Sequence, residues 1–308
     1  LHLDEGGKMR AINPESGYFG VVPGTNEKTN KNAYDMITHD AIFTNVATTE
    51  DNQPWWEGKL DGKPAKDWQG RTYDETAGKA AHPNTRFTVP ATNNPSYSSL
   101  AEAPEGVPIS AIVFGGRRKQ VAPLVYQAKD WEHGVLIGAS TASETTAAMV
   151  GDVGVVRRDP MAMKPFCGYN FADYWAHWLT FPDRSEHLPH IFHVNWFRQN
   201  EQGDFLWPGF GENLRVLEWI IERCEGRADA EETAIGFLPH VDDINTTDLD
   251  IDPATLKELL TVNGEQWRAE MASVLEYLES YGERLPEELK KQQKIIAEAL
   301  DESLAKAS

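Results

Sequence analysis

Apolar and polar residues alternate at the start of the chain, as is typical of a strand. Leu1 and Leu3 flank His2, and residues 9–12 carry a similar short run beyond Gly6-Gly7. We therefore expect the first twelve residues to form a hairpin. Short apolar runs bounded by turn residues predict further strands at 41–46, 107–114, 123–128 and 191–194.

Later in the chain the apolar spacing changes to a helical period. Residues 171–179 and 212–224 are predicted helices, and Asp252-Pro253 marks the start of another, because Asp caps a helix and Pro fits its first turn. Two more helices follow, the last over 286–305. Their apolar faces comprise Trp267, Met271, Val274, Leu275 and Leu278, then Ile296, Leu300 and Leu304. Strands and helices are mixed, which indicates an α/β (mixed α+β) class.

Composition divides the 308 residues into two regions. Residues 1–228 hold most of the glycine and aromatic residues, whereas residues 229–308 hold 19 acidic and 7 basic side chains. We expect residues 1–228 to contain the functional site. Residues 229–308 are expected to be an acidic helical extension that packs on the same domain and contributes no chemistry.

The net charge of −19 disfavours binding to nucleic acid or to anionic membranes. The chain has no apolar run of the length that spans a bilayer. A phosphate-binding site must therefore be a local basic island. Cys167 and Cys224 cannot form a disulfide framework and have no His at zinc-ligand spacing, so we expect buried thiols in a reducing cytoplasm and no metal ligands.

One basic island follows the apolar run 109–114, at Gly115-Gly116-Arg117-Arg118. Glycine at a strand end lets the backbone approach a ligand, and the planar arginine fork suits phosphate. A solvated surface pair explains the two arginines equally well.

A second island is Asn84 and Arg86, which follow His82-Pro83. Pro83 favours an extended backbone, so alternation points Asn84 and Arg86 the same way, where they can grip a carboxylate or phosphate. The alternative is an arginine in a structural salt bridge, and His82 is expected to be structural.

The densest aromatic cluster lies at residues 193–213. It fits either a corner of the core or a slot for a flat ring, and Asn213 can read a purine edge. With the two islands it suggests a nucleotide held at its base and its phosphates. The phosphate loop G-x-x-x-x-G-K-[ST] is absent from the sequence, and no metal-binding carboxylate cluster is evident.

These motifs resemble the GTP-dependent phosphoenolpyruvate carboxykinases over residues 8–228, and the acidic tail resembles that family only weakly. The resemblance implies the C-terminal mononucleotide-binding lobe of that fold, with a mixed sheet, flanking helices and a helical tail. The motifs are Gly20–Thr25, Phe43–Ala47, Trp55–Gly58, His82–Phe87, Phe114–Arg118 and the blocks at 165–171 and 191–217.

The family converts oxaloacetate and GTP to phosphoenolpyruvate, GDP and CO2, in gluconeogenesis or anaplerosis. The resemblance implies that Arg86 lies between the organic acid and the phosphoryl group, that Asn84 helps hold the acid, and that Arg117 faces the γ-phosphate. It also implies roles for the aromatic cluster. Phe197, Phe205 and Phe210 match the positions that sandwich guanine, and Asn213 matches the position that reads its edge.

The stretch from residue 143 to 155 corresponds to the family's mobile lid. Its small residues and two glycines suit a loop that closes over substrate, although a plain surface loop has the same composition. The lid residues are Glu144, Thr145, Thr146, Gly151 and Gly154.

The family's phosphate loop and its ligands for Mn2+ or Mg2+ match no residue of this chain, so we expect a C-terminal fragment that is inactive alone. Its partners would be small molecules, its state monomeric and its location the cytoplasm. Two alternatives stay open: a short protein that binds guanine nucleotide or regulates the enzyme without catalysis, and an acidic interaction module. Coding sequence that continues in frame upstream of Leu1 would favour the fragment.

Overall fold

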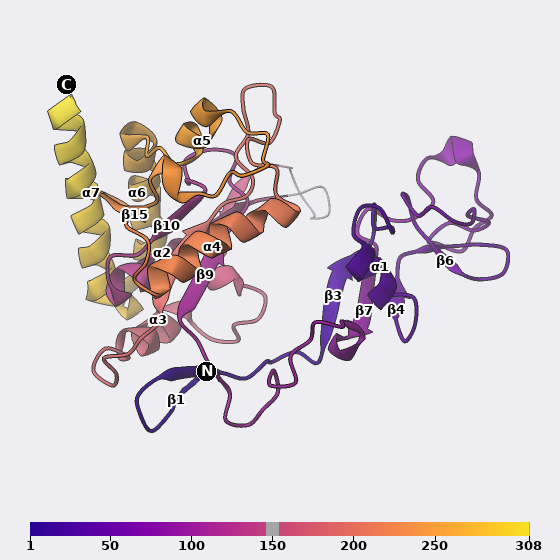
Figure 1. Cartoon of the computed structure of the whole chain (residues 1–308), viewed down its shortest axis with the longest axis horizontal. Coiled ribbons are helices and arrows are strands. Elements are labelled where there is room, and N and C mark those ends of the chain that lie inside the picture. Colours follow the sequence, from indigo (N-terminus) through magenta and orange to yellow (C-terminus); the bar gives the residue numbers. More distant parts are fainter. Residues whose placement is uncertain (146–153, 308) are drawn as a thin grey trace. The chain divides into compact units, whose positions relative to one another are not determined.

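The computed structural model describes residues 1–145 and 154–307, which divide into two compact units (Figure 1). The first comprises Arg10–Val107 together with Leu1, and the second comprises residues 2–9, 108–145 and 154–307. A small sheet of order β1-β2-β8 contains the passages of the chain between the units at Met9–Arg10 and Val107–Pro108. Its strands are β1 (His2–Leu3), β2 (Met9–Ala11) and β8 (Val107–Pro108).

The first unit is built on an antiparallel sheet of order β3-β7-β4. Gly20 on β3 pairs with Phe87 on β7, and a Cβ on Gly20 would lie 2.5 Å from the Phe87 ring, so only glycine leaves room for that ring. Phe87 and Trp56 belong to the small core of this unit. The elements are β3 (Gly17–Val21), α1 (Lys31–Met36), β4 (Ile42–Thr44), β5 (Ala47–Thr48), β6 (Pro54–Trp55), η1 (Glu75–Ala77), β7 (Arg86–Pro90) and η2 (Ala91–Asn93).

The second unit contains a five-stranded mixed sheet of order β14-β15-β10-β13-β9. Only the β13–β9 pair is parallel. The strands are β9 (Ala111–Gly115), β10 (Val125–Gln127), β13 (His190–Val194), β14 (Glu231–Thr233) and β15 (Gly236–Leu238), and β11 (Ala142–Glu144) pairs separately with β12 (Val156–Arg158). The mixed α/β class expected from the sequence is confirmed.

Helices cover both faces of this sheet. Tyr126 on β10 and Ile191 on β13 pack in a core with α2, α3, α6 and α7, whereas the adjacent Val125 and Phe192 pack in a second core with α4 and α5. Adjacent strand residues point to opposite faces, so the two cores lie on opposite sides of the sheet. The helices are α2 (Trp131–Ser140), η3 (Pro160–Ala162), α3 (Phe171–Leu179), η4 (Phe210–Glu212), α4 (Asn213–Cys224), η5 (Val241–Asp243), α5 (Pro253–Leu259), α6 (Gly264–Glu279), η6 (Gly282–Arg284) and α7 (Glu287–Ala307).

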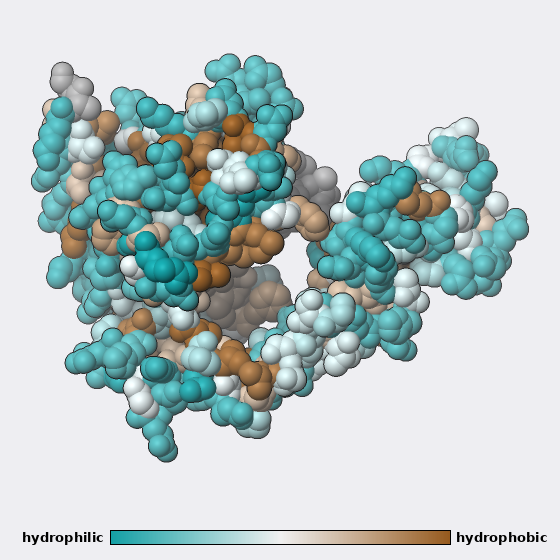
Figure 2. Space-filling view, viewed as in Figure 1, coloured by the Kyte–Doolittle hydropathy of each residue, from teal (hydrophilic) through white to brown (hydrophobic). Residues whose placement is uncertain are grey.

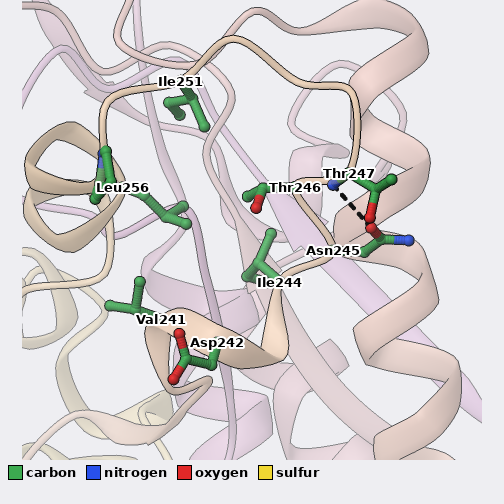
Figure 3. Close-up of a pocket in the computed structure, with 9 residues that line it drawn as sticks. Val241, Asp242, Ile244, Asn245, Thr246, Thr247, Ile251 and Leu256 are labelled. Atoms are coloured by element: carbon green, nitrogen blue, oxygen red, sulfur yellow. Dashed lines mark hydrogen bonds between the residues drawn. The ribbon is translucent and has the colours of Figure 1, made fainter.

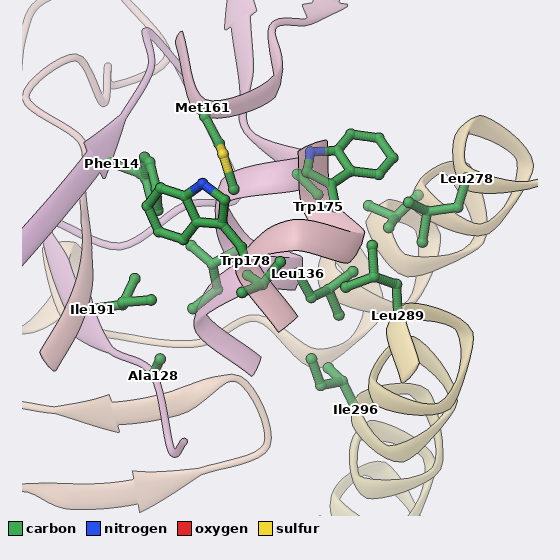
Figure 4. Close-up of a cluster of buried hydrophobic side chains, with 14 of the residues drawn as sticks. Phe114, Ala128, Leu136, Met161, Trp175, Trp178, Ile191, Leu278, Leu289 and Ile296 are labelled. Carbon is green, nitrogen blue, oxygen red and sulfur yellow. The ribbon is translucent and has the colours of Figure 1, made fainter. Parts of the chain in front are cut away.

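Figure 4 shows the larger core, to which α2 contributes Leu136, α3 Trp178, α6 Leu278 and α7 Ile296. The acidic tail is thus part of the second unit's main core. Its helices bury apolar faces and leave charged faces to solvent, and Figure 2 shows hydrophilic residues over much of the visible surface.

Most of the predicted elements are confirmed. The hairpin of β1 and β2, the strands β4, β10 and β13, and the helices α3 to α7 lie where the pattern placed them. Asp252 caps α5 by accepting from the N–H of Ala254, and the predicted face of α6 is buried at Trp267, Met271, Val274 and Leu278 and half-buried at Leu275.

Several elements differ from the prediction or were not predicted. The region 229–308, expected to be helical, begins with β14 and β15, which extend the five-stranded sheet. The run 107–114 is split between two sheets, because the Ile109 N–H donates to Met9 while the Ser110 carbonyl accepts from His190. Helix α2 was not predicted. Nearly all of its residues are buried, so it lacks an amphipathic period, and it contains Gly134 and Gly138, where a Cβ would lie within 2.3 Å of Ile191 and 2.7 Å of Phe114.

No helix in the described ranges is long and apolar enough to cross a membrane.

Candidate functional site

The loop after β9 packs against the protein's own backbone. A Cβ on Gly115 would lie 2.8 Å from the carbonyl oxygen of Val194, and one on Gly116 would lie 2.1 Å from that of Ala142. Both distances are too short for any side chain. The glycines therefore bring the loop against β13 and β11, and this contact explains them without a ligand.

Arg117 lies in this loop, and its side chain has no carboxylate partner among the described residues. Its backbone N–H donates to Ser143 Oγ at 3.2 Å, and its terminal nitrogen donates to the Glu144 carbonyl at 3.3 Å. Its Nε is buried and has no hydrogen-bond partner. An arginine that is held in place but not neutralised suits the binding of an anion.

Arg118 plays a different part, because it is buried and paired with Glu270 of α6. Its two terminal nitrogens donate to the two carboxylate oxygens at 3.1 and 2.7 Å, and Arg158 of β12 donates to the same carboxylate at 2.6 Å. Burial alone would raise the pKa of Glu270, but the hydrogen bonds and charges of Arg118 and then Arg158 outweigh it and lower the pKa to about 2. The interpretation of Arg117 and Arg118 as a solvated surface pair is wrong for Arg118.

Asn195, which no sequence motif singled out, joins this loop to the aromatic segment. Its Oδ1 accepts from the N–H groups of Arg118 and Phe197, and its Nδ2 donates to the carbonyls of Arg118 and Ala122. The side chain is fully buried. A polar residue directly after the buried strand β13 was the available signal, since a buried amide must be hydrogen-bonded.

The aromatic cluster separates into buried and exposed members. Trp207 is 1% exposed and belongs to the core, whereas Phe205 is 59% and Phe210 72% exposed. Phe197 and Phe205 meet edge to face with ring centroids 6.0 Å apart, on either side of a turn closed by the N–H of Leu206 donating to the Arg198 carbonyl. The exposed rings of Phe205 and Phe210 do not fit the interpretation of the aromatic cluster as a corner of the core.

Phe210 has a left-handed backbone, with φ of 47°. This region is sterically costly for a bulky side chain, and such residues cluster at functional sites. No ring contact within the described chain joins Phe210 to Phe197 or Phe205. Asn213 follows three residues later as the first residue of α4, and its Oδ1 accepts from the indole N–H of Trp207 at 2.9 Å.

One cavity, of about 320 Å3, unites two of the predicted regions. Arg117 lines it together with Phe197, and Trp196, Ser143 and Asp159 complete the polar and aromatic wall. Asp159 pairs with Arg157 at 3.4 Å. The cavity thus has an uncompensated arginine and aromatic rings in one wall, which suits a ligand with an anionic group and a flat ring.

Asn84 and Arg86 lie in the first unit and are brought together there by a turn. The Thr85 N–H donates to the His82 carbonyl, so Asn84 is in a turn and not in the extended backbone that we predicted. Arg86 Nε donates to Asn84 Oδ1 at 2.8 Å, and its guanidinium lies 5.1 Å from the ring centre of Phe19. Within the described chain Arg86 has no carboxylate partner, so the salt-bridge alternative is not observed.

The family model of the phosphoenolpyruvate carboxykinase C-terminal P-loop domain matches residues 1–299. The chain belongs to the GTP-dependent phosphoenolpyruvate carboxykinase family. The match extends through the acidic tail, further than the sequence motifs suggested.

Curated relatives named phosphoenolpyruvate carboxykinase [GTP] agree with this assignment. The chain is 52% identical to the protein of Chlamydia pneumoniae, over 92% of this chain and 48% of that protein. It is 48% identical to those of Anaeromyxobacter dehalogenans strain 2CP-1 (97% and 50% covered) and Treponema pallidum strain Nichols (94% and 49% covered). The chain therefore spans about half the length of the curated relatives it matches.

Of the predicted lid residues, Thr146 and Gly151 lie outside the described residues. Glu144, Thr145 and Gly154 are described. Glu144 Oε1 accepts from the Lys119 N–H at 2.7 Å. The Gly154 N–H donates to the Thr145 carbonyl at 2.9 Å, and Gly154 has a φ of 83°. The bond between Gly154 and Thr145 continues the β11–β12 pairing.

The metal ion expected for this carboxykinase family does not fit the described residues by themselves. No group of three or more His, Cys, Asp or Glu side chains among them is arranged to hold a cation. We therefore derive no chemical step through a metal.

A second cavity, of about 390 Å3, lies between η5 and α5 (Figure 3). Val241, Ile244, Ile251 and Leu256 form its apolar wall, and the Thr247 N–H donates to Asn245 Oδ1 at 3.1 Å. None of the residues predicted for the site lines it. The geometry therefore favours the cavity at Arg117 and Phe197 as the functional one.

Proposed function

We propose that this chain supplies the guanine-binding residues of a GTP-dependent phosphoenolpyruvate carboxykinase, together with two of the arginines that bind its anionic groups, Arg86 and Arg117. The reaction is oxaloacetate and GTP to phosphoenolpyruvate, GDP and CO2. The observation that carries the proposal is the cavity of about 320 Å3 in which Arg117, without a carboxylate partner among the described residues, shares a wall with Phe197.

The proposed roles follow from the charge that the reaction develops. Loss of CO2 leaves an electron pair on the remaining carbon skeleton as an enolate, whose oxygen then takes the γ-phosphoryl group while GDP leaves. Arg117 stabilises charge on the transferring phosphoryl group. Arg86 and Asn84 hold the organic acid. Phe197, Phe205 and Phe210 stack on guanine, and Asn213 reads its edge.

For the carboxykinase to which this chain would contribute, we infer a dependence on Mn2+ or Mg2+, a role in gluconeogenesis or anaplerosis, a monomeric state and a cytoplasmic location. Residues 1–228 contain the proposed site. Residues 229–308 contribute the strands β14 and β15 to the sheet and then form helices on the same domain. Glu270, on α6 in this region, supports the arginine loop through its pairing with Arg118.

Calorimetric titration of the 308-residue chain with GDP and with ADP tests the proposal. We expect GDP to bind more tightly than ADP. We also expect Phe210→Ala to weaken GDP binding by about 5- to 150-fold, the loss of one base–aromatic stack of about 1–3 kcal/mol. Ile221→Ala, which removes an exposed apolar side chain on α4, is the matched control and leaves the affinity unchanged. Equal affinity for GDP and ADP, or an unchanged Phe210→Ala variant, would contradict the proposal.

A further inference from the structure

Trp207 has a polar contact that the proposed guanine site does not yet use. The indole is 1% exposed and packs in the core beside α4 and α5. Its Nε1–H donates to Oδ1 of Asn213 at 2.9 Å. The buried Trp207 is thus hydrogen-bonded to Asn213, the side chain that is proposed to read the base.

The direction of this bond orients the Asn213 amide. An indole nitrogen can only donate, so the amide atom that faces it must be the carbonyl oxygen. The NH2 group of Asn213 then points away from Trp207. Its Nδ2 has no hydrogen-bond partner among the described residues, and the side chain is only partly buried. Asn213 therefore presents a donor, and not an acceptor, to a ligand.

An asparagine amide without such a hydrogen bond has no fixed orientation. By rotating about its last bond, an asparagine can present either its oxygen or its NH2 group, and so accept a base edge of either polarity. Other buried indoles of this chain, those of Trp175, Trp219 and Trp267, have no partner for Nε1 among the described residues. Pairing of the indole N–H is thus not a general requirement of burial in this protein.

We propose that Trp207 is a positioning residue that sets base selection, an inference that rests on the proposed function. By holding the Asn213 oxygen, it turns the NH2 group toward the base. A donor at this point favours the ring carbonyl oxygen of guanine and opposes the amino group of adenine, which is itself a donor. A site built to hydrogen-bond one polarity rejects the other, because a polar group is then left unpaired.

The experiment measures the ratio of GDP to ADP affinity by calorimetry in the wild type, Trp207→Phe and Trp219→Phe chains. Trp207→Phe keeps an aromatic ring but loses the N–H, and should lower the ratio about three- to tenfold, the loss of one neutral hydrogen bond. Trp219→Phe makes the same change in the same core cluster, where the indole has no partner among the described residues, and keeps the wild-type ratio.

A second variant keeps the proposal testable if Trp207→Phe is unstable. Asn213→Asp can still accept from Trp207 but has no donor for the base, so its ratio should fall by at least as much. In the wild type, the indole N–H of Trp207 should be a distinct resonance that moves in Asn213→Ala and not in Ile221→Ala.

The outcomes separate the two proposals. A wild type with no preference for GDP overturns the proposed function itself. A wild type that prefers GDP, with the same preference in Trp207→Phe or Asn213→Asp, overturns the role of Trp207 and leaves the proposed function in place. An equal fall of the ratio in Trp207→Phe and Trp219→Phe assigns the effect to core packing, and it also overturns that role.

Discussion

Asn195 and Arg118 exchange two hydrogen bonds. The Arg118 N–H donates to Asn195 Oδ1 at 3.2 Å, and Asn195 Nδ2 donates to the Arg118 carbonyl at 2.8 Å. The same Oδ1 accepts from Phe197 at 3.2 Å. One buried amide thus fixes the position of the arginine loop relative to the aromatic segment, and the two segments line the same cavity.

Asn195→Ala should therefore lower both stability and nucleotide affinity. The change leaves backbone N–H and C=O groups buried without partners, each at a cost of about 1–3 kcal/mol. We expect a loss of at least about 3 kcal/mol in the free energy of unfolding, measured by denaturant titration. Asn200→Ala is the control, because Asn200 accepts two backbone N–H groups in an exposed turn. An equal loss in the two variants would contradict the role of Asn195.

Substitution by Gln should have different effects at the two adjacent arginines, lowering stability at Arg118 and GDP affinity at Arg117. Arg118→Gln leaves the buried Glu270 with Arg158 alone, and we expect a loss of the order of 3 kcal/mol in the free energy of unfolding. Arg117→Gln breaks no ion pair within the described chain and should stay within about 1 kcal/mol of the wild type. Its effect should appear in calorimetry as weaker GDP binding. The assignment fails if Arg117→Gln is the less stable of the two variants.

Phe210 should show a conflict between stability and binding. Its φ of 47° costs a residue with a Cβ about 1–2 kcal/mol, and glycine escapes this cost. Phe210→Gly should therefore be more stable than Phe210→Ala by about 1 kcal/mol in thermal or denaturant unfolding, although both lose the ring and bind GDP weakly. At Phe205, whose φ is not positive, glycine should be no more stable than alanine. The same ranking at both sites would remove the strain argument.

Acid should destabilise the second unit in a defined window. Burial, and then the charge of Arg118, lower the pKa of His193 to about 4 against the opposing charge of Glu270. Burial likewise lowers the pKa of His133 to about 4, and its Nδ1 accepts from the Lys129 N–H, which requires the neutral ring. The unfolded chain binds protons near pH 6.5 and the folded chain only near pH 4, so stability falls as the pH drops between these values.

His193→Phe should lessen this dependence by about 1.4 kcal/mol per pH unit within the window, as measured by denaturant unfolding at a series of pH values. Phe retains a ring to stack on Tyr126. His187→Gln, at an exposed position, serves as the control and should keep the wild-type slope. An unchanged slope in His193→Phe would show that His193 is not buried in the neutral form.

Local sequence patterns were sufficient to predict many of the helices and strands. Residues 171–179 follow a helical period with one buried face and form the predicted helix, and Asp252-Pro253 begins a helix because its capping bond is formed within a few residues. Helix α2 escaped prediction because it is buried on nearly all sides. Burial then leaves no alternation for the sequence to display.

The sequence by itself determined the family, through motifs such as Phe114–Arg118, and the residue types that the proposed site requires. Only the tertiary structure decided how those residues divide their roles. Arg117 and Arg118 are neighbours of equal chemistry, and Arg118 is neutralised because Glu270, which lies 152 positions later in the chain, packs against it. Trp207 and Asn213 also differ from other Trp and Asn residues only through a contact. Local propensity acts over a few residues, whereas burial and pairing depend on which distant segments meet.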